Sequence, residues 1–278
     1  MYVSFAYGID GLLGHMKKLS QSIGAALLFP VAATATYFSN PAEPALQTDG
    51  LLKSPPSWYC LRVGYMSDHL YRQRYNEEFH IEGTSNPSSY AKLITDAGTL
   101  TLNFKNWLDI NMLLGSAQML IDRDIYTKRQ LAWGIGAKWL IYHNETFFVG
   151  LDVKYFESNQ KPVYLVSTDY AYNIVSSFKM NYSEQQAALG VAYRTRMICP
   201  YLYVSYLYSK IDPNPCIVFV QMPTYDGIGQ SYSTSVTDRR RWGMAFGATV
   251  IGGTKGSVTL ESRFFNQNAI NVSGEVRF

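Results

Sequence analysis

The sequence predicts an all-β protein: a closed, antiparallel transmembrane β-barrel of ten to twelve strands, with long outer loops and short periplasmic turns. Three observations lead to this prediction. Ten segments between Tyr59 and Phe278 alternate apolar and polar residues with a period of two. Charged residues make up only 16% of the chain, against about 25% in soluble domains. Aromatic residues make up 15% and gather at segment ends, as they do at membrane boundaries.

The amino end is predicted to be a signal peptide covering residues 1–35. A basic pair, Lys17-Lys18, precedes an apolar stretch from Ile23 to Ala33, and Ala33-Thr34-Ala35 has the small-x-small pattern of a cleavage site. A buried helix is the alternative, but Pro30 would interrupt it. Residues 1–15 have no targeting pattern and indicate a mis-assigned start, with Met16 as the initiator.

Two parts follow the signal peptide: a mature amino-terminal segment, residues 36–56, and the barrel, residues 57–278. The alternating segments of the barrel are Tyr59–Tyr65, Leu100–Phe104, Leu108–Leu114, Leu131–Ile141, Phe147–Tyr155, Ala187–Tyr193, Leu202–Tyr208, Trp242–Val250, Val258–Phe264 and Ile270–Phe278. Strands that cross a bilayer need about 9–11 residues. An apolar face opposite a polar face fits a barrel with lipid outside and water inside.

A secreted β-sandwich is the competing fold, since its strands also alternate around an apolar core. The barrel is favoured by the low charge, by a carboxyl-terminal strand that ends in Phe278, and by aromatic residues at segment ends. A terminal aromatic residue resembles the signal that outer-membrane barrels present to the barrel-assembly machinery. The aromatic residues at segment ends are Trp58, Tyr59, Trp107, Trp139, Tyr142, Tyr193 and Trp242.

The connections set the strand number. Short connections are expected at 105–107, 143–145, 195–200 and 252–256, and long polar ones at 77–92, 158–180 and 211–238. Ten strands with both ends in the periplasm satisfy this pattern. Further alternation within 161–180 and 217–222 allows one more hairpin, and hence twelve strands.

The faces opposite the apolar stripes supply pore-lining candidates and predict a weak anion preference, because rings of like charge select ions. A ten-stranded barrel lies between eight strands, which fill with side chains, and sixteen, which hold a channel. Both a plugged and an open lumen remain possible, and the inward Gly134, Gly136, Gly243 and Gly247 favour open space. The charged candidates are Arg62, Lys105, Lys138, Lys154, Arg194, Arg263 and Arg277 against Asp109, Asp152, Glu261 and Glu275.

Other functional classes find little support. A formal charge of +3, from 24 basic and 21 acidic residues, is too small and dispersed for nucleic-acid binding. Asp68-His69 and His80 are the only catalytic candidates, and neighbours on a strand point to opposite faces, so no enzyme is predicted. Four scattered His residues predict no metal site and no cofactor.

An odd set of three cysteines, Cys60, Cys199 and Cys216, permits disulfide links to envelope neighbours in an oxidising compartment. The other expected partners are outer-membrane lipid, the assembly machinery and further copies of the chain. Residues 225–237 and the basic run Arg239–Arg241 could serve a second function, surface adhesion through the outer loops. The simpler interpretation of both is a solvated loop with a charged strand end.

Three blocks of sequence resemble the chlamydial major outer membrane porin family. The first is Ser39–Leu46 followed by Asp49-Gly50. The second is Ala188–Arg194 followed by Pro200-Tyr201. The third joins Gly247–Thr249 and Ser257–Arg263 to Val272–Phe278. The resemblance is strong over residues 39–76 and 182–278 and weak between them.

This resemblance implies a general diffusion porin and surface antigen, integral to the bacterial outer membrane. The chain departs from the family in its shorter length and few cysteines, which indicates a paralogue. The predicted function is therefore passive diffusion of small hydrophilic solutes or ions. The alternative is an adhesin or structural envelope protein that acts through its outer loops.

Overall fold

The computed structural model describes residues 38–47, 58–76, 90–121, 125–166, 171–174, 179–213, 216–221, 228–232, 235–252 and 255–278. All of them lie in one compact unit, residues 32–278. The predicted signal peptide lies outside the described residues. In these ranges no helix has the length and apolar character needed to cross a membrane.

Ten strands form the wall of a barrel, which confirms the predicted fold class. Each pairs antiparallel with the next, and the last pairs with the first. They are β1 (Tyr59–Arg74), β2 (Tyr90–Phe104), β3 (Leu108–Ile121), β5 (Gln130–His143), β6 (Phe147–Val166), β8 (Met180–Tyr193), β9 (Ile198–Pro213), β13 (Trp242–Ile251), β14 (Gly256–Phe264) and β15 (Gln267–Arg277).

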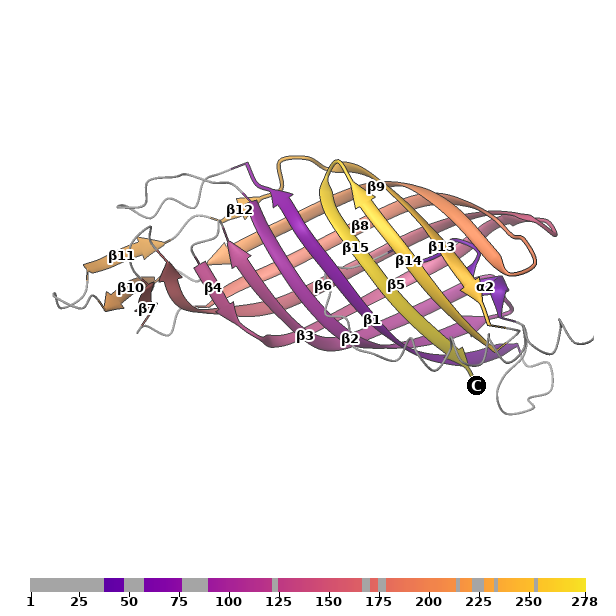
Figure 1. Ribbon diagram of the computed structural model, residues 1–278, viewed down its shortest axis with the longest axis horizontal. Coiled ribbons are helices and arrows are strands. Elements are labelled where there is room, and N and C mark those ends of the chain that lie inside the picture. The colour runs from indigo at the N-terminus through magenta and orange to yellow at the C-terminus, as the bar shows by residue number, and fades with distance from the viewer. Residues whose placement is uncertain are drawn as a thin grey trace, which may run out of the picture. The chain divides into compact units, whose positions relative to one another are not determined.

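The barrel closes where β1 meets β15. The register of this pair runs from Arg62 opposite Arg277 to Gln73 opposite Gln267. Figure 1 shows the strands tilted across the barrel, with the carboxyl terminus and the short helix α2 (Glu43–Leu46) at the same end. Closure leaves no unpaired sheet edge in the ring, as a membrane requires.

The wall exposes apolar side chains on its outer face and encloses charged ones in its lumen, which is the reverse of the distribution in a soluble protein. On neighbouring strands, Leu100 and Leu114 are 44% and 59% exposed, while Arg62 and Asp109 are each 1% exposed. The predicted alternation is therefore the alternation between an apolar outer face and the lumen. This arrangement suits strands whose outer face touches lipid.

Aromatic side chains mark the ends of the outer face. All seven predicted end residues are exposed, and most cluster near the end of the barrel that holds the short turns. Indole and phenol rings favour the boundary between acyl chains and water. The exposed set is Trp58, Tyr59, Trp107, Trp139, Tyr142, Tyr193 and Trp242.

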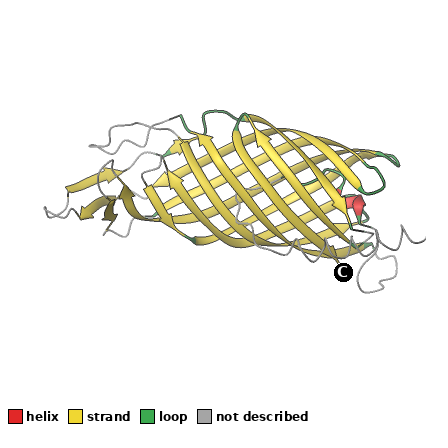
Figure 2. Ribbon diagram, viewed as in Figure 1, coloured by secondary structure: helices red, strands yellow, loops and turns green. Residues whose placement is uncertain are grey.

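The two ends of the barrel differ in their connections (Figure 2). Connections at 105–107, 144–146, 194–197 and 252–255 define the short-turn end. At the opposite, long-loop end, the alternation that allowed twelve strands lies in an extension of β6 and in two of the five described short strands outside the ring. The five are β4 (Ile125–Lys128), β7 (Ala171–Ile174), β10 (Cys216–Gln221), β11 (Ile228–Tyr232) and β12 (Val236–Thr237).

A charge on the outer face tests its contact with lipid. Leu260 lies mid-strand on β14 and is 56% exposed, so we expect Leu260→Arg to lower the free energy of unfolding. The expected loss in liposomes is about 2–4 kcal/mol. Tyr193→Arg at the short-turn end is the matched control, with an expected loss of about 0–1 kcal/mol. Equal losses from urea unfolding would contradict the membrane-spanning placement.

Candidate functional site in the barrel lumen

Alternation along the strands carries ten of the eleven predicted charged residues into the lumen. Nine are buried or nearly so, and Arg194, at the end of β8, is half-buried. The inward set is Arg62, Asp109, Lys138, Asp152, Lys154, Arg194, Glu261, Arg263, Glu275 and Arg277.

Lys105 is the exception and corrects the prediction. β2 ends at Phe104, and Lys105 with Asn106 forms the turn to β3, with φ angles of 48° and 60°. Two consecutive positive φ angles, with the Trp107 N–H donating to the Phe104 carbonyl at 2.9 Å, are the geometry of a tight hairpin turn. The turn places Lys105 at the exposed rim, outside the lumen.

Residues 38–47 lie inside the barrel near the short-turn end; we call them the lumen segment. All are buried except Ala45, which is half-buried, and the segment includes helix α2. The sequence predicted a mature amino-terminal segment here but not its place inside the barrel. Phe38 packs on Tyr203, with ring centroids 5.3 Å apart.

Side chains of the wall bind the backbone of the lumen segment. The Glu261 carboxylate accepts the N–H groups of Phe38 and Ser39 at 3.0 and 3.1 Å. It also accepts the Tyr201 hydroxyl at 2.9 Å. Because Glu261 lies 223 residues after Phe38, this contact depends wholly on the closed barrel.

Carbonyl groups at the other end of the segment are bound in the same way. Arg62 Nη1 donates to the Glu43 carbonyl at 3.0 Å, and Asn103 Nδ2 donates to the Pro44 carbonyl at 3.1 Å. Arg277 donates to the carbonyl of Gln47. Buried carbonyls at the end of a helix need such partners.

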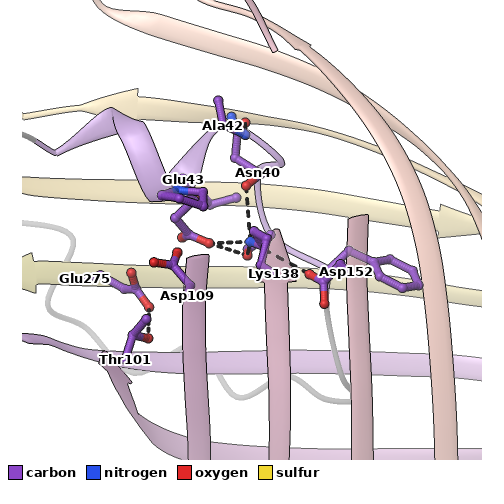
Figure 3. A network of polar contacts seen from close by, with 12 residues as sticks. Asn40, Ala42, Glu43, Thr101, Asp109, Lys138, Asp152 and Glu275 are labelled. Carbon is purple, nitrogen blue, oxygen red and sulfur yellow. Dashed lines mark hydrogen bonds and ion pairs between the residues drawn. The ribbon is translucent and has the colours of Figure 1, made fainter. Parts of the chain in front are cut away.

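Lys138 on β5 makes the most contacts with the lumen segment (Figure 3). Its ammonium group pairs with the Glu43 carboxylate and also contacts the Ser39 hydroxyl. It donates to the Asn40 carbonyl at 3.1 Å and lies 3.8 Å from Asp152 of β6. Burial alone would raise the pKa of the Glu43 carboxyl, but the charges of Lys138 and Arg62 lower it from 4.5 to about 2.

The wall contains its own ion pairs beside the segment. Arg62 bridges β3 and β15 by pairing with Asp109 and with Glu275, the latter at 3.1 Å. Deeper in the barrel Arg263 pairs with Asp68. A buried charge without a partner is costly, so these pairs hold the charges in place.

An apolar layer lies in the long-loop half of the lumen. Its side chains are almost fully buried, although they point inward from the same strands that carry the charges. Among its members are Met66, Leu70, Leu93, Leu113, Met119, Ile121, Phe156, Met180, Tyr182 and Ile211. The sequence did not predict this layer, because its inward residues are apolar and weaken the alternation there.

The lumen beside the lumen segment contains little free space. A cavity of about 30 Å³ lies between the lumen segment and the wall at Arg62 and Asp109, space for about one or two water molecules. A larger hollow of about 580 Å³ is lined mainly by outward side chains, including Ile110, Ile135 and Val153. We therefore assign it to the outer surface.

The inward glycines leave less space than the sequence suggested. A Cβ on Gly136 would lie 2.5 Å from Asn111 Oδ1, and one on Gly247 would lie 2.5 Å from the Tyr201 ring. These positions are small because neighbouring side chains occupy the space. Gly150 makes room for the lumen segment, since a Cβ there would lie 2.9 Å from the Pro41 carbonyl oxygen.

Cys60 and Cys199 are free thiols buried in the barrel. Cys199 lies against the lumen segment: its Sγ is 3.8 Å from Asn40 Oδ1, and its carbonyl accepts Asn40 Nδ2 at 2.8 Å. The side chain of Cys216, and residues 225–227 and 233–234 of the proposed adhesive loop, lie outside the described residues. Cross-linking to envelope neighbours stays a prediction, which the burial of these two thiols makes less favourable.

The catalytic candidates do not converge. Asp68 faces the lumen and pairs with Arg263, whereas His69 is on the outer face and stacks on Tyr71 at 5.3 Å. His80 lies outside the described residues. The described ranges hold no group of three His, Cys, Asp or Glu residues placed to bind a metal.

Comparisons with known proteins bear on the family. No protein-family model matches the chain. The serovar E major outer membrane porin of Chlamydia trachomatis is 21% identical over 393 residues, covering 95% of this chain and 100% of the relative. The serovar D porin is 22% identical with the same coverage. The chain resembles these porins along nearly its whole length. The family resemblance seen in the sequence is thereby confirmed.

Similar solved structures include the NalP autotransporter translocator domain of Neisseria meningitidis, with a TM-score of 0.46, 10% identity, and coverage of 97% of this chain and 98% of that one. The outer membrane protease OmpT of Escherichia coli has a TM-score of 0.35, 10% identity, and coverage of 79% and 96%. Scores this low carry no argument. The closed barrel and the named porin relatives make this chain an integral protein of the bacterial outer membrane.

Breaking a buried ion pair tests the lumen network. We expect Asp68→Asn to lower the free energy of unfolding by about 3 kcal/mol, because Arg263 loses a buried carboxylate partner. Asp212→Asn is the control: its pair with Lys210 is 2.6 Å long but partly exposed, so the expected loss is under about 1 kcal/mol. Urea unfolding in detergent measures both, and similar losses would contradict the network.

The lowered pKa of Glu43 predicts how acid affects the lumen segment. Its charge stabilises the segment fully above pH 4.5, and that contribution is lost as the pH falls to about 2. We expect the α2 amides to lose hydrogen-exchange protection across this window. Glu43→Gln should remove this component, and an unchanged pH profile would contradict it. Other titratable groups facing Glu43 are Asp152, Lys154, Tyr201, Tyr203 and Glu275.

Proposed function

We propose that the protein is an outer-membrane channel of the porin type that passes small hydrophilic solutes or ions when its lumen opens. The observation that carries the proposal is the charged interior of a closed barrel whose outer face is apolar. The relatives named as porins support the same function. The pairing of Asp68 with Arg263, away from His69, supports the absence of an enzymatic role.

The described lumen favours a gated channel over a permanently open one. Two layers fill it: the lumen segment with its charged wall near the short-turn end, and the apolar layer beyond. Apolar constrictions gate some channels by excluding water. Flexible side chains such as Met66, Met119 and Met180 suit a layer that rearranges.

The charges of the wall give little basis for the anion preference expected from the sequence. Lys105 leaves the lumen set, whereas Asp68 and Glu184 join it as buried inward carboxylates. The described strands then contribute six basic and six acidic inward side chains. We therefore propose a weakly selective pore. The two sets are Arg62, Lys138, Lys154, Arg194, Arg263 and Arg277 against Asp68, Asp109, Asp152, Glu184, Glu261 and Glu275.

The second candidate function is adhesion or envelope structure through the outer loops. It is favoured by the filled lumen and by the strand extension at the long-loop end, where β6 runs for 20 residues and pairs with β4 and β7. Deleting the proposed adhesive loop, residues 225–237, separates the two functions. Loss of cell binding with unchanged conductance would favour adhesion.

Conductance of the refolded chain tests the channel. In planar bilayers we expect brief, infrequent openings, because both filled layers must rearrange before ions pass. In a tenfold salt gradient the reversal potential should lie near zero, since the inward charges of the wall balance. Heat-denatured protein is the control for leak. Silent bilayers containing correctly folded barrel would reject the channel and leave the second candidate.

A further inference from the structure

The lumen segment is separate from the hydrogen-bonded ladder of the barrel. Among the described residues, its backbone–backbone hydrogen bonds are internal: Glu43 N–H to the Asn40 carbonyl at 3.0 Å, and Ala45 N–H to the Ala42 carbonyl at 2.9 Å. The ring of ten strands is complete without it. Withdrawal of the segment would therefore break no strand pairing.

The contacts that hold the segment are mostly polar and can be exchanged for water. They join side chains of the wall to polar groups of the segment: Lys138 contacts Ser39, Asn40 and Glu43, and Glu261 accepts the N–H groups of Phe38 and Ser39. Water entering the lumen would hydrate both partners, so each loss falls short of the penalty for an unsatisfied buried group. The apolar anchors are few: Phe38, Ala42 and Leu46.

The wall is also shaped to receive the segment. Gly150 lies against Pro41, where a Cβ would lie 2.9 Å from its carbonyl oxygen and 3.0 Å from its Cβ. Asn40 occupies a polar seat between Cys199 and Thr249, donating to both at 2.8 and 3.0 Å. Such complementarity gives the segment one defined position to which it can return.

We propose that residues 38–47 are a displaceable plug, latched by the Glu43–Lys138 ion pair, whose withdrawal opens the short-turn half of the lumen to water. The inference deepens the proposed channel function and rests on it, because the plug regulates that same lumen. Lys138, the wall residue of this latch, lies on β5. Asp152 of β6 is 3.8 Å from its ammonium group and remains beside it when Glu43 leaves. The ammonium group therefore keeps a carboxylate partner in the open state.

A native cysteine reports the position of the plug. Cys199 is fully buried beneath Asn40, so a small thiol reagent reaches it from the short-turn end only when the segment moves away. Cys60→Ser and Cys216→Ser leave it as the only thiol. The full chain with these two changes, refolded into liposomes, is the parent for every measurement.

The main variant reverses the charge of the latch. Glu43→Lys places an ammonium group against Lys138 and Arg62, and we expect Cys199 to react about 100-fold faster with a methanethiosulfonate reagent. Glu145→Lys is the matched control: it makes the same charge change in an exposed turn at the same end. Its rate should stay within about twofold of the parent, as expected for a solvated surface charge.

Two labelling results would overturn the plug. One is an unchanged Cys199 rate in a Glu43→Lys variant that keeps the folded gel mobility. The other needs no variant and applies even if Glu43→Lys fails to refold. In the parent, labelling in low urea should depend on urea much less steeply than global unfolding does. Equal dependence would show that Cys199 is reached only through unfolding.

A reversible lock separates this inference from the channel itself. Asn40→Cys places a second thiol next to Cys199, and oxidation should tie the plug to β9. We expect oxidation to stop conductance and reduction to restore it. In the control variant Asn40→Ser, neither treatment should change the conductance. If conductance is unchanged after this disulfide forms, the plug is rejected and the channel function is retained. Silence in every variant, with fast labelling in Glu43→Lys, would reject the channel and leave a displaceable segment.

Discussion

The requirement that every backbone polar group in a lipid layer find a partner within the protein governs this structure. An open sheet fails that requirement at its two edges, and the ring meets it by pairing β1 with β15. Once the ring is closed, each residue has only two environments, lipid or lumen. The period-two pattern, the aromatic end residues and the inward charges all follow from that division.

Closure of the ring also buries polar and charged side chains in the interior, and these side chains then need partners. Ten strands enclose too little space for a wide aqueous channel, so charged side chains facing inward become buried and need partners. Arg62 satisfies this need with Asp109 and Glu275, and Lys138 with Glu43 and Asp152. The lumen segment thus supplies one of the two carboxylates that lie beside Lys138.

The strands could be predicted because lipid imposes a local rule on each of them. The run Leu131–Ile141 alternates in the sequence and lies in β5 with the expected faces. The second half of β1 was harder to predict. The strand continues to Arg74 past a bulge between Leu70 and Arg72, and this bulge shifts which residues face inward. No alternation predicted this continuation.

The candidate site was predictable in part for the same reason. Inward charges on regular strands were found, whereas Lys105 was misplaced because the strand ends one residue earlier. The place of residues 38–47 was missed because it depends on contacts across more than 200 residues, such as Phe38 with Glu261. Its one local sign is a stretch with Pro41 and Pro44 that breaks strand periodicity.

The seam between the first and last strands has a consequence for how the molecule is made. Phe278 donates its N–H to the Leu61 carbonyl at 2.9 Å, next to the Arg62–Arg277 end of the seam between β1 and β15. Residues 38–47 precede the first strand and end up enclosed. The ring must therefore close around these residues or admit them through an open end of the barrel.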